Sequence, residues 1–183
     1  MKTKLLITLL FIINFSFSQN KTFKSSQFNW KIEIPEQCEL IESENWLKEK
    51  NKENTKKGYK LETDENSKIL IAIKIDSLNY FVAYNDNDFK TNSNAFMDFQ
   101  KAMYEVSLKN VKIEVNKSDE KLKISNIEFN HLKHEYIFPD KSYLITEVYG
   151  TSIKKKVFSV FLIYNDKEKG AVLLENFKNS IFK

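Results

Sequence analysis

The sequence contains no arginine: all 29 of its basic residues are lysines, set against 25 acidic residues. Proteins that bind nucleic acids rely on the planar guanidinium of arginine for bidentate contacts and gather positive charge on one face. No such one-sided basic patch is visible, and the short run Lys154–Lys156 fits the solvated edge of a hairpin. We therefore expect no nucleic-acid partner.

Glycine, proline and cysteine are scarce, with three, two and one residues respectively. Three glycines make a phosphate-cradling loop difficult to build, and neither a Gly-x-Ser-x-Gly nor a Cys-x-x-Cys motif occurs. A single cysteine cannot form an intramolecular disulfide, so Cys38 is interpreted as a small packed residue. We expect no cofactor and no metal ion, and a fold stabilised by packing.

Residues 1–18 have the pattern of a secretion signal. Two lysines precede an apolar core from Leu5 to Phe15, and Ser16-Phe17-Ser18 offers small residues for cleavage before Gln19. The apolar core is too short for a permanent membrane anchor, which is the alternative interpretation, and no later stretch is apolar enough to cross a membrane. We expect residues 19–183 to be a single α+β domain that is exported to the periplasm or the cell exterior.

The C-terminal part of the chain predicts antiparallel strands closed by a helix. Alternating apolar residues predict a strand with one buried face at 132–138. A second strand is predicted at 143–149, which is rich in β-branched and aromatic residues. The stretch Val157–Tyr164 is apolar at both parities, which is typical of a central strand that is covered on both faces. A closing helix over 167–182 is predicted from apolar residues at helical spacing: Leu173, Leu174, Phe177 and Ile181.

The rest of the chain predicts a further helix for the other face of that strand. It covers 94–108, with a buried stripe formed by Ala95, Phe96, Phe99, Ala102, Met103 and Val106. If both helices instead lie on one face, the uncovered face becomes the best candidate for a binding surface. The remaining predicted elements are strands at 28–34, 69–75, 80–84, 111–115 and 122–129, a turn at Asn116–Glu120, and a polar helix at 44–57 docked by Trp46 and Leu47.

Two features carry possible chemistry. Asn85–Asp88 is rich in oxygen ligands, but it lacks the glycine and the final glutamate of a calcium loop, so a turn before a helix explains it better. His131 and His134 point to opposite faces of the predicted strand, which disfavours a metal pair. We keep His131, His134 and Glu135 as candidate functional residues and identify no catalytic set.

The order of these elements resembles the PsbP-like α/β fold. The resemblance also rests on Ile34-Pro35-Glu36, which ends the first strand, and on Asn179-Ser180-Ile181-Phe182 at the end of the closing helix. It implies a curved, mainly antiparallel sheet of about six to seven strands sandwiched between helices. The ending Ser18-Gln19 is similar to the signals of small secreted proteins of Bacteroidetes.

Two functions of different class follow. The resemblance implies a protein-docking or accessory role more often than catalysis, which favours an exported non-enzymatic module that binds a protein partner or a small apolar ligand. The alternative is a hydrolase-like exported enzyme with a dispersed acid/base site that includes His131, His134 or Glu135.

Overall fold

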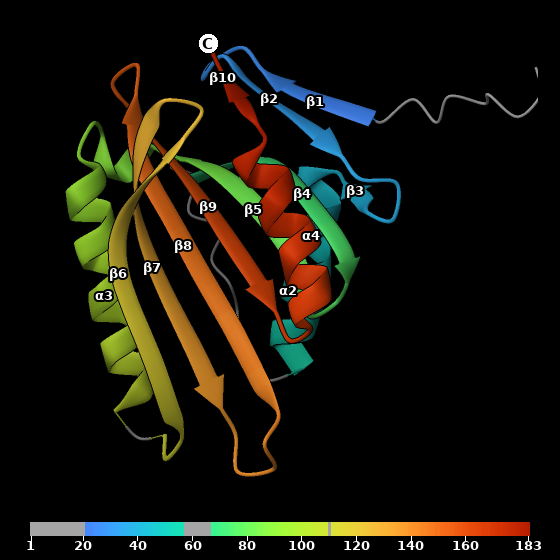
Figure 1. Ribbon diagram of the computed structural model, residues 1–183, viewed down its shortest axis with the longest axis vertical. Helices are drawn as coiled ribbons and strands as arrows, with labels where there is room; N and C mark the ends of the chain where they lie inside the picture. The colour runs from blue at the N-terminus through green and yellow to red at the C-terminus, as the bar shows by residue number, and fades with distance from the viewer. Residues whose placement is uncertain (1–20, 57–66, 110) are drawn as a thin grey trace, which may run out of the picture.

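The computed structural model describes residues 21–56, 67–109 and 111–183, so the predicted signal at 1–18 lies outside the described residues. The described strands form two antiparallel sheets (Figure 1). The larger sheet has seven strands in the order β3 (Glu39–Ile41), β4 (Ser67–Asp76), β5 (Asn79–Asp86), β9 (Lys156–Tyr164), β8 (Tyr143–Ile153), β7 (Ile127–Ile137) and β6 (Glu114–Ile124). The smaller sheet has the order β1 (Lys21–Ser25), β2 (Trp30–Ile34) and β10 (Ile181–Phe182).

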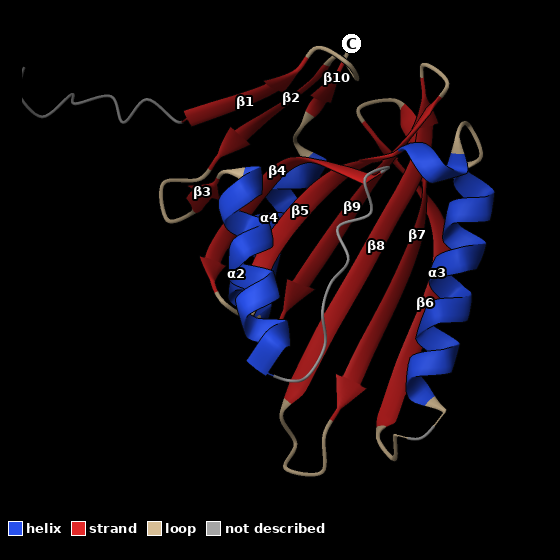
Figure 2. Ribbon diagram, turned by 180° about the vertical axis from the view of Figure 1, so that it is seen from behind, coloured by secondary structure: helices blue, strands red, loops and turns tan. Residues whose placement is uncertain are grey.

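Helices lie on both faces of the seven-stranded sheet. Helix α4 (Lys167–Lys178) packs on one face, whereas α2 (Ser43–Lys56) and α3 (Ser93–Leu108) stand apart on the other, with the short helix η1 (Asn87–Phe89) before α3 (Figures 1 and 2). The predicted class, an α+β fold with an antiparallel sheet between helices, is confirmed.

Strand β9 lies in the middle of the sheet and is covered on both faces, as its two-sided apolar pattern predicts. Phe158, Val160 and Leu162 lie in the main core with Leu173 and Phe177 of α4. The opposite face of β9 packs in a smaller cluster with α3, formed by Val157 and the half-buried Phe161 together with Phe96 and Met97. The two helices therefore cover opposite faces of one central strand.

The smaller sheet closes the α4 face at one end. Trp30 of β2 is almost completely buried and packs edge-on against Phe158, with 4.9 Å between ring centroids. Phe182 of β10 stacks on Trp30 at 5.9 Å. Strand β2 and the last residues of the chain therefore meet in the main core, because both carry large aromatic side chains that this face can bury.

The predicted turn at Asn116–Glu120 is wrong. These residues lie inside β6, which pairs with β7 without interruption from Glu114 to Ile124. The turn falls instead at Ser125 and Asn126, whose φ angles of 48° and 68° are the left-handed values of a tight hairpin turn. Strand β6 is the edge of the sheet and is mostly exposed, so its polar residues fit a strand as well as a turn.

The closing helix ends earlier than predicted. It stops at Lys178, and Ile181 lies in β10, where 43% of its surface is exposed, so it is not part of the buried helical stripe. Helix α2 matches its prediction more closely, since Trp46 is buried and Leu47 packs beside it.

The predicted buried stripe of α3 is also wrong in part. Phe96 and Met97 are its only buried residues among those that the structure describes. Phe99, Met103 and Val106 are exposed by 49%, 53% and 63%. The helix is rotated relative to the prediction, so that it presents Phe96, Met97 and the half-buried Tyr104 to the sheet.

We expect Gly170→Ala to destabilise the protein by about 1–2 kcal/mol in urea unfolding. A Cβ atom at Gly170 would lie 2.3 Å from Cδ2 of Tyr164, whose hydroxyl is held 2.7 Å from Glu147 Oε1, so the ring cannot easily move away. The overpacking cost of about 1–3 kcal/mol then exceeds the helix-propensity gain of alanine, which is at most about 1 kcal/mol. Glu175→Ala on the exposed side of α4 is the control, and a Gly170→Ala protein more stable than the wild type would contradict this packing.

Candidate functional site

His131 and His134 lie on opposite faces of β7, as their strand spacing predicts. His131 stacks on Tyr149, which belongs to the main core on the α4 side. His134 packs against Tyr104 of α3, with 4.3 Å between the centroids of the two tilted rings. The two histidines are therefore separated by the sheet and do not form one site.

On the α4 face, His131 belongs to a buried polar cluster centred on Glu147 of β8. The His131 Nε2 atom lies 2.9 Å from Glu147 Oε2, and its Nδ1 atom lies 3.2 Å from Oε1 of Glu120 on β6. Both ring nitrogens of His131 therefore face carboxylate oxygens, one from each neighbouring strand. The hydroxyls of Tyr149 and Tyr164 also donate to Glu147.

The cluster holds Glu147 in its charged form. Burial by itself raises the pKa of Glu147, but the hydrogen bonds from His131, Tyr149 and Tyr164 outweigh it and lower the pKa to about 2. Burial and the neighbouring carboxylate raise the pKa of both tyrosines, which keeps their hydroxyls as donors. Glu147 is 2% exposed and His131 4%, so neither is open to a substrate from solution, and the cluster ties β6, β7, β8 and β9 together.

Glu135, the third residue predicted from the sequence, lies on the same face as His131 but outside this cluster. Its carboxylate forms an ion pair of 3.3 Å with Lys167 at the start of α4. Burial raises the pKa of Glu135, but the hydrogen bonds from Lys167 and Asn116 outweigh this effect. The pKa of Glu135 therefore lies below its usual value. The contact attaches α4 to the sheet, and the three predicted residues are not brought together.

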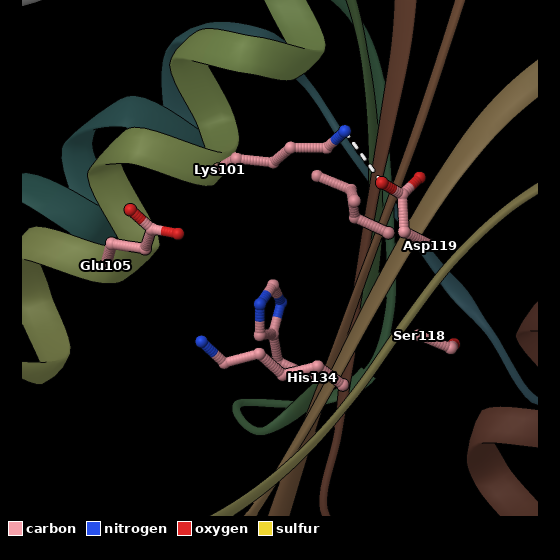
Figure 3. Close-up of a pocket in the computed structure, with 7 residues that line it drawn as sticks. Lys101, Glu105, Ser118, Asp119 and His134 are labelled. Atoms are coloured by element: carbon pink, nitrogen blue, oxygen red, sulfur yellow. Dashed lines mark ion pairs between the residues drawn. The ribbon is translucent and has the colours of Figure 1, made fainter.

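His134 lines a pocket on the α3 face. The pocket has a volume of about 240 Å³ and lies between α3 and strands β6 and β7 (Figure 3). Leu132 and His134 come from β7, Lys117 and Asp119 from β6, and Lys101 and Glu105 from α3. Lys101 and Asp119 are joined across the pocket mouth by an ion pair of 2.7 Å. A small open cavity whose lining includes charged side chains therefore lies beside α3.

Most residues of the Glu147 cluster and of the pocket beside His134 are not predicted from the sequence. Glu147 sits between Thr146 and Val148 in an apolar strand, and that charged residue inside a buried run is the one signal that could have identified it. The pocket has no such signal, because it depends on how α3 lies on the edge of the sheet. Its charged residues look like ordinary surface residues in the sequence.

The other features that the sequence singles out give less support for a functional site. Asn85 and Asp86 end β5, and Asp86 accepts hydrogen bonds from Ser67 and Ser159. Burial raises the pKa of Cys38 to about 11, so its thiol is protonated at neutral pH. Within the described ranges, no group of three or more histidine, cysteine or acidic residues could hold a metal ion. No helix in the same part of the chain is long and apolar enough to cross a membrane.

Comparison with known proteins supports the fold. No family model matches the sequence, and no curated protein matches it. The solution structure of cyanobacterial PsbP (CyanoP) from Synechocystis sp. PCC 6803 is similar to this chain, with a TM-score of 0.56 and 7% sequence identity, over 93% of this chain and 96% of that one. The identity is too low to show more than the fold. The predicted PsbP-like fold is therefore confirmed.

We expect Glu147→Gln to destabilise the protein by about 3 kcal/mol at pH 7, the cost of breaking a buried charged pair. Because the folded pKa of Glu147 is about 2 against an ordinary value of 4.5, its contribution is fully present above about pH 4.5 and is lost as the pH falls towards 2. Urea unfolding at pH 7, 4.5 and 3 measures both effects.

Glu175→Gln, an exposed residue of α4, is the control and is expected to change stability by less than about 0.5 kcal/mol. Between pH 4.5 and 3, we expect the free energy of unfolding to fall by more in the wild type than in Glu147→Gln. Parallel pH profiles of the two proteins would contradict the role assigned to this carboxylate.

Proposed function

We propose that this chain is an exported, non-enzymatic accessory module that binds a partner protein through α3. The observation that carries this proposal is the exposed apolar stripe of α3, formed by Phe99, Met103 and Val106 and here called the α3 stripe. Three large apolar side chains on successive turns of one helix are unusual on a surface unless something covers them.

The spacing of the α3 stripe indicates what covers it. The steps from Phe99 to Met103 and from Met103 to Val106 are four and three residues, the spacing at which one helix packs against another. Recognition of an amphipathic helix in this way uses anchors at the same spacing. We therefore infer that the partner presents a helix with a matching apolar stripe.

The attachment of α3 to the sheet supports this role. Phe96 and Met97 fix its first turns against β7, β8 and β9, and Tyr104 packs on His134. Phe99 lies at the rim of this cluster, with 5.6 Å between its ring centroid and that of Phe89. The helix is thus held by one side while the α3 stripe faces outward.

Two further observations support an exported accessory module. Residues 1–18, with the expected cleavage between Ser18 and Gln19, have the composition of a secretion signal. The chain shares its fold with the cyanobacterial PsbP protein. The buried cluster around Glu147 and His131 leaves no open space for a substrate, and the two histidines lie on opposite faces of the sheet, so they do not act on one substrate together.

The test is photo-cross-linking in the organism that produces the protein. A benzophenone side chain at Met103 or Val106 is expected to capture one partner protein, whereas the same group at Ala171 on the exposed side of α4 does not capture it. The full secreted chain and the purified partner are then used to measure affinity.

We expect the double variant Phe99→Gln, Met103→Gln to weaken that binding at least about 100-fold, because central apolar anchors each contribute about 2 kcal/mol. Both residues are half-exposed, so the free energy of unfolding should change by less than about 1 kcal/mol. Ala171→Gln is the matched control. Equal affinity of the double variant and the wild type, or capture of the same protein from both helices, would overturn the proposal.

A further inference from the structure

The pocket beside His134 lies on the flank of α3 that faces the sheet edge, away from the α3 stripe. Figure 3 shows Lys101 and Glu105 on one wall, Asp119 on the other and the His134 ring projecting between them. Its volume of about 240 Å³ corresponds to about eight water molecules, since each occupies about 30 Å³ in the liquid. Such a space suits a small metabolite and is too small for a peptide helix.

The charges that line the pocket balance each other. Lys101 and Asp119 satisfy one another in their 2.7 Å ion pair. The other two charged residues of the lining are Glu105 from α3 and Lys117 from β6. Within the described part of the chain, neither of them forms an ion pair. The pocket therefore offers one free carboxylate and one free ammonium group.

His134 provides a third polar group. Its side chain is 5% exposed, and its Nδ1 atom has no hydrogen-bond partner among the described residues. Burial, assisted by the positive charge of Lys117, lowers the pKa of His134, so the ring is neutral at physiological pH. A buried polar atom that lacks a partner costs about 1–3 kcal/mol. The Nδ1 atom has almost no exposed surface, so a ligand in the pocket recovers that cost when a small rotation of the ring brings Nδ1 to it.

We propose that this pocket binds a small zwitterion with the chemistry of a free amino acid. Its ammonium group pairs with Glu105, its carboxylate pairs with Lys117, and the imidazole of His134 completes the hydrogen bonding. Leu132 on the floor of the pocket contacts the carbon skeleton. The site is separate from the α3 stripe, so the two proposals stand or fall independently.

Simpler ligands fit the lining less well. A pure anion would bring a charge beside Glu105 and Asp119, and a pure cation would bring one beside Lys101 and Lys117. A zwitterion is the small-molecule class that complements both free charges at once.

Isothermal titration calorimetry of the full secreted chain tests the proposal. The probes are the common L-amino acids, followed by the N-acetyl and the amide derivatives of the one that binds most tightly. We expect at least one amino acid to bind with a Kd below about 1 mM, and each derivative, which lacks one of the two charges, to bind at least about tenfold more weakly.

Two substitutions identify which charge each side chain recognises. Glu105→Gln should weaken binding of the amino acid about tenfold while leaving the N-acetyl derivative unchanged, because that derivative has no ammonium group. Lys117→Gln should weaken the amino acid to a similar extent while leaving the amide derivative unchanged. Glu114→Gln and Lys123→Gln are the matched controls. Each removes one charge of the same sign as its counterpart, but from a residue of β6 that lies outside the pocket.

Three outcomes would overturn the proposal. The first is that no amino acid binds with a Kd below about 1 mM. The second is that the N-acetyl or amide derivative binds as tightly as the amino acid. The third is that Glu105→Gln and Lys117→Gln bind like the two control variants.

Discussion

The burial of both faces of β9 is the constraint on which the rest of the structure depends. Val157, Phe158, Val160 and Leu162 have almost no exposed surface, although neighbouring residues of a strand point to opposite faces. One helix can cover only one of those faces. The chain therefore needs α4 on one side and α3 on the other, and β5 and β8 are held as the inner neighbours of β9.

The two faces are not covered equally. The α4 face contains the main core, the smaller sheet and the buried cluster around Glu147. On the other face, α3 is attached by Phe96, Met97 and Tyr104 and leaves the α3 stripe and the pocket beside His134 at the surface. Stability thus depends mainly on one side of the sheet, and both proposed binding sites lie on the other.

The sequence predicts most of the elements because their signals are local. The two-sided apolar pattern of β9 and the alternation in β7 are properties of the chain itself, and they correctly predict the central strand and the opposite orientations of His131 and His134. The order of these elements likewise predicts the PsbP-like fold, which the structural similarity to cyanobacterial PsbP supports.

What the sequence could not predict depends on contacts between distant residues. The stripe of α3 has helical periodicity, but only the sheet beneath it determines which side of the helix is buried. The periodicity alone therefore predicts Phe99 and Met103 in the core, although both are about half exposed. Asn116–Glu120 has the composition of a turn, yet the pairing of β6 with β7 makes it a strand. The cluster around Glu147 unites residues from four strands, and no spacing in the sequence indicates it.

Amide hydrogen exchange of the folded protein, followed by NMR, tests this division between the two faces most directly. The account predicts that the amides of α3 after Gln100 open with a free energy at least about 2 kcal/mol below that of α4 and β9, whose amides exchange only on global unfolding. If the amides of α3 are as well protected as those of β9, α3 belongs to the stable core, and the division between a stabilising face and a binding face is contradicted.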